Sequence, residues 1–83
     1  MGTSVGPIEF LMAVAEERSV GAASQRLNVD RSVIIEELVS LETRIGHDVL
    51  VRTPAGLRLT EAGRQWLGEA IHSRSREGPV AAP

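Results

Sequence analysis

Residues 19–38, SVGAASQRLNVDRSVIIEEL, constrain the fold of this chain more than any other part of the sequence. They predict two short helices joined by a tight turn at residues 28–30, with the second helix beginning at about Arg31. The first of these helices carries the small neighbours Ala22 and Ala23, and small side chains let one helix pack closely across another. The stretch therefore predicts a helix-turn-helix whose second helix turns one face outward.

Helical spacing extends this motif in both directions. Residues 7–17 open with a proline, which suits the first turn of a helix, and they repeat apolar side chains every three or four positions. Beyond the turn, apolar residues fall on one face at spacings of four, three and four, and Gly46 follows as a C-cap. These residues are Ile34, Leu38, Leu41 and Ile45. Three oxygen-bearing side chains predict N-caps for the second, third and last helices: Ser19, Asp30 and Thr60.

After Gly46 the helical period ends. Two short β-prone runs flank a turn that closes at Gly56, which predicts a β-hairpin over residues 49–59. A last helix is expected at 60–72, and its apolar side is Ala62, Trp66, Leu67, Ala70 and Ile71. Residues 1–6 and 73–83 predict a flexible lead-in and a flexible tail.

The expected architecture is one mainly α domain over residues 7–72. Its order of elements, a three-helix core followed by a short β-hairpin wing and a C-terminal helix, is that of a winged helix-turn-helix. The whole chain has 83 residues, which is enough for one small core and no second domain.

Composition excludes several classes of function. The chain has no cysteine, which excludes disulfides and thiolate metal ligands. No apolar run approaches the roughly 18 residues of a membrane span, and no signal-peptide pattern opens the chain, so we expect a cytoplasmic protein without a membrane partner. His47 and His72 stand apart from any second histidine or carboxylate at ligand spacing. Without a nucleophile–base pair either, we expect no metal, no cofactor and no enzymatic activity.

The segment from 7 to 70 resembles the amino-terminal DNA-binding domain of LysR-type transcriptional regulators. The resemblance rests on VAEERS at 14–19, on LE..IG at 41–46 and on LRLTEAG at 57–63. The small pair Ala22 and Ala23 with Leu27, and Leu50 with Arg52, also match. The LTEAG phrase, at its distance beyond the hairpin, makes the combination specific.

This resemblance implies a bacterial transcription regulator that binds duplex DNA sequence-specifically through its third helix and its wing. Transferred position by position, the family's base-reading positions hold Arg31, Ser32, Ile35 and Glu36. Arg52, which enters the wing, matches the family's phosphate-contacting arginine, and Arg58 on the returning strand is a candidate for a second backbone contact.

The resemblance also implies a homodimer formed through the C-terminal helix, with Trp66, Leu67, Ala70 and Ile71 at its interface. Family members continue from this helix into a ligand-binding domain, which has no counterpart in the present sequence. The sequence is then either an excised domain or a natural small protein, and since neither end carries an obvious tag, we favour a natural stand-alone regulator without an effector domain.

The outward face of the third helix departs from the family pattern. Serine is common at position 35, with arginine, lysine or glutamine at 36, 37 and 39, but this chain has Ile35, Glu36, Glu37 and Val39. One glutamate can accept a hydrogen bond from cytosine, whereas two adjacent acids are repelled by a polyanion. The net charge of −2 is also unusual for a DNA-binding domain.

The apolar pair Ile35 and Val39 lies one helical turn apart and suits either thymine methyl groups or a protein surface. A second function therefore stays open, that of a winged-helix protein-interaction module with lost or weakened DNA binding. Such a module would act as an adaptor, an antirepressor or a polymerase-contacting factor.

Overall fold

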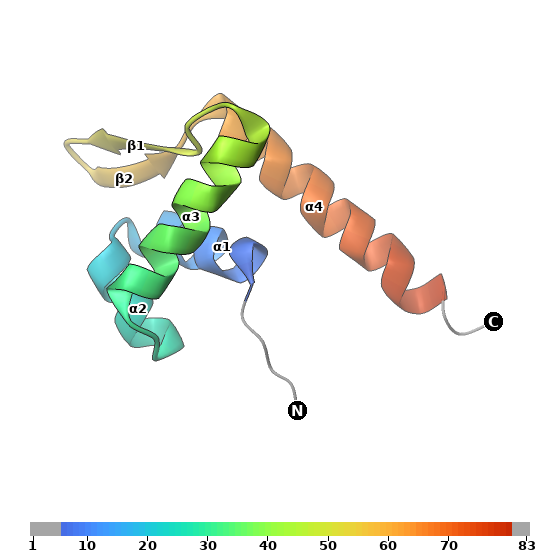
Figure 1. Cartoon of the computed structure of the whole chain (residues 1–83), viewed down its shortest axis with the longest axis horizontal. Coiled ribbons are helices and arrows are strands. Elements are labelled where there is room, and N and C mark those ends of the chain that lie inside the picture. Colours follow the sequence, from blue (N-terminus) through green and yellow to red (C-terminus); the bar gives the residue numbers. More distant parts are fainter. Residues whose placement is uncertain (1–5, 81–83) are drawn as a thin grey trace.

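The computed structural model describes residues 6–80, with side chains described up to residue 74. Its elements follow in the order α1 (Pro7–Glu17), α2 (Val20–Leu27), α3 (Arg31–Ile45), β1 (Leu50–Thr53), β2 (Gly56–Leu59) and α4 (Glu61–Val80) (Figure 1). The predicted winged helix-turn-helix is confirmed in the type and order of its elements. Residues 1–5 of the expected lead-in and 81–83 of the expected tail lie outside the described residues.

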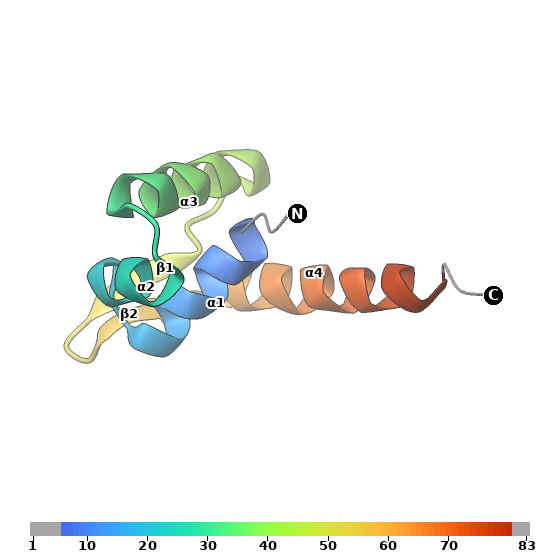
Figure 2. The same ribbon diagram turned by 90° about the horizontal axis from the view of Figure 1, so that it is seen from below.

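The core is small and almost entirely aliphatic. It contains Phe10, Leu11, Ala13 and Val14 of α1, Ala23 of α2, Ile34, Leu38 and Leu41 of α3, and Val49. Ala23 is completely buried, so that the small side chain predicted at the helix crossing lies inside the three-helix core. The predicted apolar face of α3 is confirmed, with Ile45 half-buried at its end. Figure 2 shows α3 above α1 and α2, with its opposite side free.

The helix ends follow the capping residues closely. The Ser19 hydroxyl accepts a hydrogen bond from the amide of Ala22 at 2.9 Å, and Gly46 ends α3 with a φ of 78°. Asp30 is the N-cap residue of α3 as predicted, but its side chain makes no capping hydrogen bond. Its backbone carbonyl instead accepts from Val33 at 3.1 Å, so the first turn of α3 closes without help from the carboxylate.

The β-hairpin pairs Leu50 with Leu59 at its base and Thr53 with Gly56 at its tip. The wing begins at Leu50 rather than at 49, because Val49 is fully buried and its amide donates to Oε2 of Glu42 at 3.0 Å. This bond ties the connection after α3 back to α3 itself. It also gives the glutamate of the LE..IG motif a structural role.

Gly56 lets the hairpin tip close against the connection between α1 and α2. It has a φ of 104°, and a Cβ there would lie 2.7 Å from the carbonyl oxygen of Arg18. The neighbouring amide of Leu57 donates to the same carbonyl at 3.0 Å. The wing is therefore fixed to the helical body by backbone contact.

Helix α4 begins where Thr60 caps it, since the Thr60 hydroxyl accepts from the amide of Gly63 at 3.0 Å. The helix continues to Val80, past the predicted end at 72, so the expected tail is helical over its described part. Residues 69–77 contain neither glycine nor proline, and nothing in them interrupts a helix that has already begun. In Figures 1 and 2 this helix extends away from the other elements.

Candidate nucleic-acid interface

The predicted reading residues of α3 are all exposed. Ile34, Leu38 and Leu41 turn inward, whereas five other positions on the first turns of α3 are exposed: Arg31, Ser32, Ile35, Glu36 and Val39. Ile35 and Val39 keep 48% and 54% of their surface exposed, which is high for large apolar side chains. This face is therefore free to contact a partner.

Arg31 lies at the junction of α2 and α3. Its guanidinium carbon is 3.7 Å from the position that a Cβ on Gly21 would occupy, so the side chain reaches back over the first turn of α2. The free backbone N–H groups at the N-terminus of α2 carry partial positive charge at the same position. A group that approaches Arg31 therefore meets a fixed cation beside a helix N-terminus.

The acidic residues of the chain divide into paired and unpaired groups. Arg26 bridges Glu16 at 2.7 Å and Glu17 at 3.3 Å, and the hydrogen bond to Glu16 raises the pKa of Arg26. Glu36 and Glu37, in contrast, form no ion pair with any side chain described between residues 6 and 74. Both side chains are exposed, Glu36 on the outward face of α3 and Glu37 on its flank.

The register of the wing separates its two arginines. Arg52 is paired with Leu57, whereas Arg58 is paired with Val51. Neighbouring strand residues point to opposite faces, so the side chains of Arg52 and Arg58 leave the hairpin on different sides. Both are exposed, but the two candidate phosphate contacts do not form one patch.

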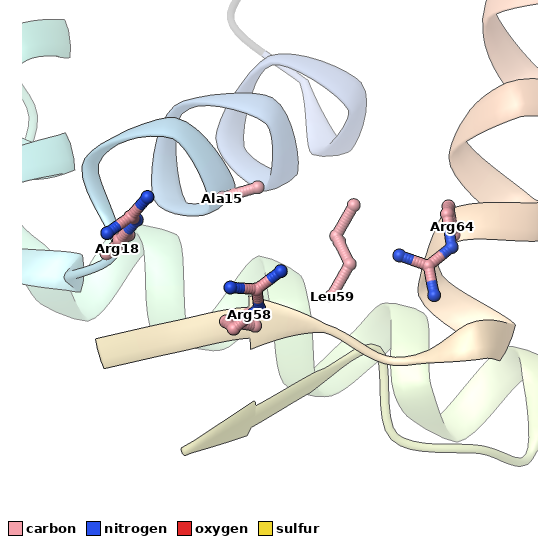
Figure 3. A pocket seen from close by; sticks show the side chains of 5 residues that line it. All are labelled: Ala15, Arg18, Arg58, Leu59 and Arg64. Atoms are coloured by element: carbon pink, nitrogen blue, oxygen red, sulfur yellow. The ribbon is translucent and has the colours of Figure 1, made fainter. Parts of the chain in front are cut away.

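Arg58 instead lines a cavity of about 190 Å³ together with Ala15, Arg18, Leu59 and Arg64. Figure 3 shows Arg18 beside the end of α1, Arg58 on β2 and Arg64 reaching in from α4. Sequence reasoning did not single out Arg18 or Arg64. One sequence signal pointed toward this grouping. Because side chains alternate along a strand, Arg58 lies on the same face of β2 as Gly56, and Gly56 contacts the backbone of Arg18.

The predicted interface residues of α4 differ in how free they are. Trp66 and Leu67 are half-buried and pack against the core of the domain. Ala70 is half-buried as well, whereas Ile71 keeps 37% of its surface exposed. The apolar side of α4 thus packs against the domain's own core in the first turns of the helix and is exposed to solvent at Ile71.

Other kinds of site find no support in the part of the chain that the structure describes. No group of three or more histidine, aspartate or glutamate side chains there is placed to hold a metal ion. Within residues 6–80, no helix combines the length and the apolar character needed to cross a membrane.

Comparison with known proteins identifies the family. The family model of bacterial regulatory helix-turn-helix proteins, lysR family, matches residues 7–64. This chain belongs to the LysR family. An uncharacterized HTH-type transcriptional regulator of Escherichia coli (strain K12), YnfL, is 34% identical over 82 residues, covering 99% of this chain and 28% of YnfL.

A second relative, the HTH-type transcriptional regulator ClcR of Pseudomonas putida, is 36% identical over 63 residues. That match covers 76% of this chain and 21% of ClcR. The chain therefore spans between a fifth and a third of the length of these curated relatives. Both relatives are regulators by name, which places the chain in a family of regulators rather than of enzymes.

Solved structures agree with this assignment. The chain superposes on the CbnR_DBD–DNA complex with a TM-score of 0.76 and 31% identity, covering 90% of this chain and 86% of that chain. Full-length CbnR, a LysR family transcriptional regulator, matches with a TM-score of 0.77 over 90% of this chain and 26% of that chain. The resemblance carried by the sequence motifs is confirmed.

Proposed function

We propose that this chain is the DNA-binding part of a bacterial transcription regulator, acting in the cytoplasm on duplex DNA. The observation that carries the proposal is the exposed face of α3 beside an exposed wing, on a scaffold that matches a domain solved with DNA. A helix of this kind fits the major groove, and a wing beside it meets the flanking backbone.

The base-reading surface would be Arg31, Ser32, Ile35 and Glu36, with Val39 beside them. Arginine forms two hydrogen bonds to guanine, and glutamate accepts one from the amino group of cytosine. Ile35 and Val39 can contact thymine methyl groups, which few polar side chains do well. The chemistry of this face therefore favours a site of mixed composition, in which the cytosine opposite Glu36 offsets its repulsion from phosphate.

Arg52 would supply a phosphate contact from the wing. It is exposed, it lies on β1 of the backbone-fixed hairpin, and its register places it on the opposite side from Arg58. Arg58 belongs to the same proposed surface only if the DNA backbone reaches the cavity that it lines.

The LysR family also favours a homodimer through α4, with Trp66, Leu67, Ala70 and Ile71 at the interface. Ile71 is the natural contact point, because it is the member of this set with the most exposed side chain. Two copies would present two α3 helices to the half-sites of an imperfect palindrome.

The test measures binding of the full chain to random duplex DNA by fluorescence anisotropy, first at about 50 mM salt and then at rising salt concentrations. We expect binding that weakens steeply with salt, because most non-specific affinity comes from counterion release. Failure to bind any duplex at the lowest salt contradicts the proposal.

The alternative function is a protein-interaction module, and one observation favours it. The unpaired Glu36 lies beside the exposed apolar Val39, and an acid in this place is repelled by the phosphates of DNA, whereas an exposed apolar patch suits a protein contact. Glu36→Arg distinguishes the two functions. For a module that has lost DNA binding, this change creates DNA affinity where the original chain has none; for a DNA reader, it alters the preferred base pair of an existing activity.

A further inference from the structure

The cavity between α1, β2 and α4 gathers three arginines from three separate parts of the chain. Arg18 follows α1, Arg58 lies on β2, and Arg64 lies in the first turns of α4 (Figure 3). We propose that this cavity is a phosphate-binding site, which we name the arginine cavity. It lies apart from the exposed face of α3.

The backbone of the fold brings these arginines together. Gly56 lacks a side chain, so the wing approaches the Arg18 backbone closely enough for the amide of Leu57 to donate to the Arg18 carbonyl. Arg58 is two residues beyond Gly56 and therefore points to the same side of β2, toward Arg18. The cavity thus follows from the way in which the wing is attached.

Helix α4 completes the arrangement from the opposite side. Gly63 packs directly on the connection before β1, where a Cβ would lie 2.3 Å from the carbonyl oxygen of Val49. This contact fixes the first turn of α4, and Arg64 is the next residue. Its guanidinium reaches into the space in front of Leu59 (Figure 3).

The positive charge in the cavity is poorly compensated within the described part of the chain. Arg18 and Arg58 form no ion pair with any side chain between residues 6 and 74. Arg64 forms one ion pair, with Glu61 at 3.6 Å. Both side chains of this pair are largely exposed, so water screens their attraction. No acidic residue lines the cavity itself.

The shape and chemistry of the cavity suit a tetrahedral oxyanion. Guanidinium groups offer paired N–H donors that match phosphate oxygens, and the apolar Ala15 and Leu59 form the rest of the wall. A volume of about 190 Å³ admits one phosphate group with its first water molecules. Such a group has two sources: the backbone of bound DNA, or a free phosphate or phosphorylated small molecule.

The experiment is an NMR titration of the full chain with inorganic phosphate and with pyrophosphate, at constant ionic strength set by chloride. We expect saturable shifts in the side-chain N–H signals of the three arginines and in the amide of Leu59. Arg58→Gln and Arg18→Gly should each weaken phosphate binding about tenfold. Glycine is chosen at position 18 because Arg18 has a φ of 64°, which glycine adopts without strain.

Arg44→Gln is the matched control, since Arg44 is an exposed arginine outside the cavity. The control should bind phosphate as the original chain does, and all variants should melt at similar temperatures. The proposal is overturned if no saturable shift appears, or if Arg44→Gln loses as much affinity as Arg58→Gln.

DNA binding in phosphate-free chloride buffer then distinguishes the two sources. If the cavity holds a backbone phosphate, Arg58→Gln lowers the salt slope of DNA affinity by about one. If it holds a free phosphate, the slope stays unchanged while phosphate binding is lost. A chain that binds phosphate but no duplex would reject the proposed function and leave the arginine cavity standing.

Discussion

Gly63 has the closest backbone neighbour of the glycines in the described part of the chain. It is buried, and the Cβ of any other residue would come 2.3 Å from the carbonyl oxygen of Val49. The same carbonyl accepts a hydrogen bond from the amide of Thr60 at 3.0 Å, so it is not free to move aside. The glycine of the LTEAG phrase therefore sets how closely α4 packs on the connection before the wing.

We predict that Gly63→Ala destabilises the domain by about 1–3 kcal/mol, because the added methyl group forces two fixed backbones apart. Urea unfolding followed by circular dichroism measures the change. Gly68→Ala is the matched control in the same helix, since nothing lies within 4 Å of a Cβ there. It should be stabilising by roughly 0.5–1 kcal/mol through helix propensity. Equal effects at both positions would refute the crowding argument.

Glu42 provides a second prediction for a single side chain. Its carboxylate accepts from the buried Val49 amide at 3.0 Å, and removal of the acceptor leaves that amide without its partner. Glu42→Ala should cost about 1–2 kcal/mol in the free energy of unfolding, whereas Glu42→Gln keeps an acceptor and should cost less. A urea titration of both variants measures the difference. If both variants unfold at the same urea concentration as the original chain, this hydrogen bond does not contribute to stability.

Arg31 and Arg52 should differ in what their loss does to DNA binding. Arg52→Ala removes the proposed phosphate contact, so it should weaken binding to all sequences alike and lower the salt slope by about one. Arg31→Ala should cost about 1–3 kcal/mol on the preferred site and relax the preference at particular base pairs. Binding to a randomised duplex pool, sequenced before and after selection, measures both effects. An unchanged preference after Arg31→Ala would make Arg31 a phosphate contact beside the N-terminus of α2.

At the scale of elements, local patterns predicted most of the structure. The spacing of Ile34, Leu38 and Leu41 determines which side of α3 is buried, and the outward positions follow directly from it. The arginine cavity was not predicted, because Arg18, Arg58 and Arg64 come together only through the docking of three elements. The end of α4 was placed too early for a related reason: residues beyond 72 are polar, and polarity alone does not stop a helix.

Helix α4 is also joined to α1 by an ion pair that titrates. Arg74 bonds to the carboxylate of Glu9, and this hydrogen bond holds the pKa of Glu9 below its ordinary value of 4.5. A carboxylate whose pKa is depressed in the folded state adds stability above its unfolded pKa and loses it as the pH falls through the folded value. We therefore predict that the melting temperatures of the original chain and of Arg74→Gln differ slightly at neutral pH and converge as the pH falls below 4.5 and through the folded pKa of Glu9. A difference that persists in acid would show that Arg74 acts by packing.

At the scale of the whole molecule, the proposed DNA-binding surface and the proposed dimer surface lie at opposite ends. The exposed side of α3 and the wing occupy one end, and α4 extends from the other with Ile71 uncovered (Figures 1 and 2). Since the chain carries a net charge of −2, a single copy gains little from general attraction to DNA. In the proposed homodimer, affinity for a specific site depends on two copies that bind two half-sites together, because the second contact becomes intramolecular.

We therefore predict that Ile71→Asp yields a monomer in light scattering and weakens binding to a palindromic site far more than binding to a half-site. The buried charge would disrupt an interface formed by α4, whereas the contacts of α3 remain intact. Ser73→Asp is the control, because position 73 is exposed and lies about 200° around the helix from position 71. It should leave both the mass and the affinity unchanged. A monomeric original chain, or equal losses on both kinds of site, would mean that α4 does not join the two copies.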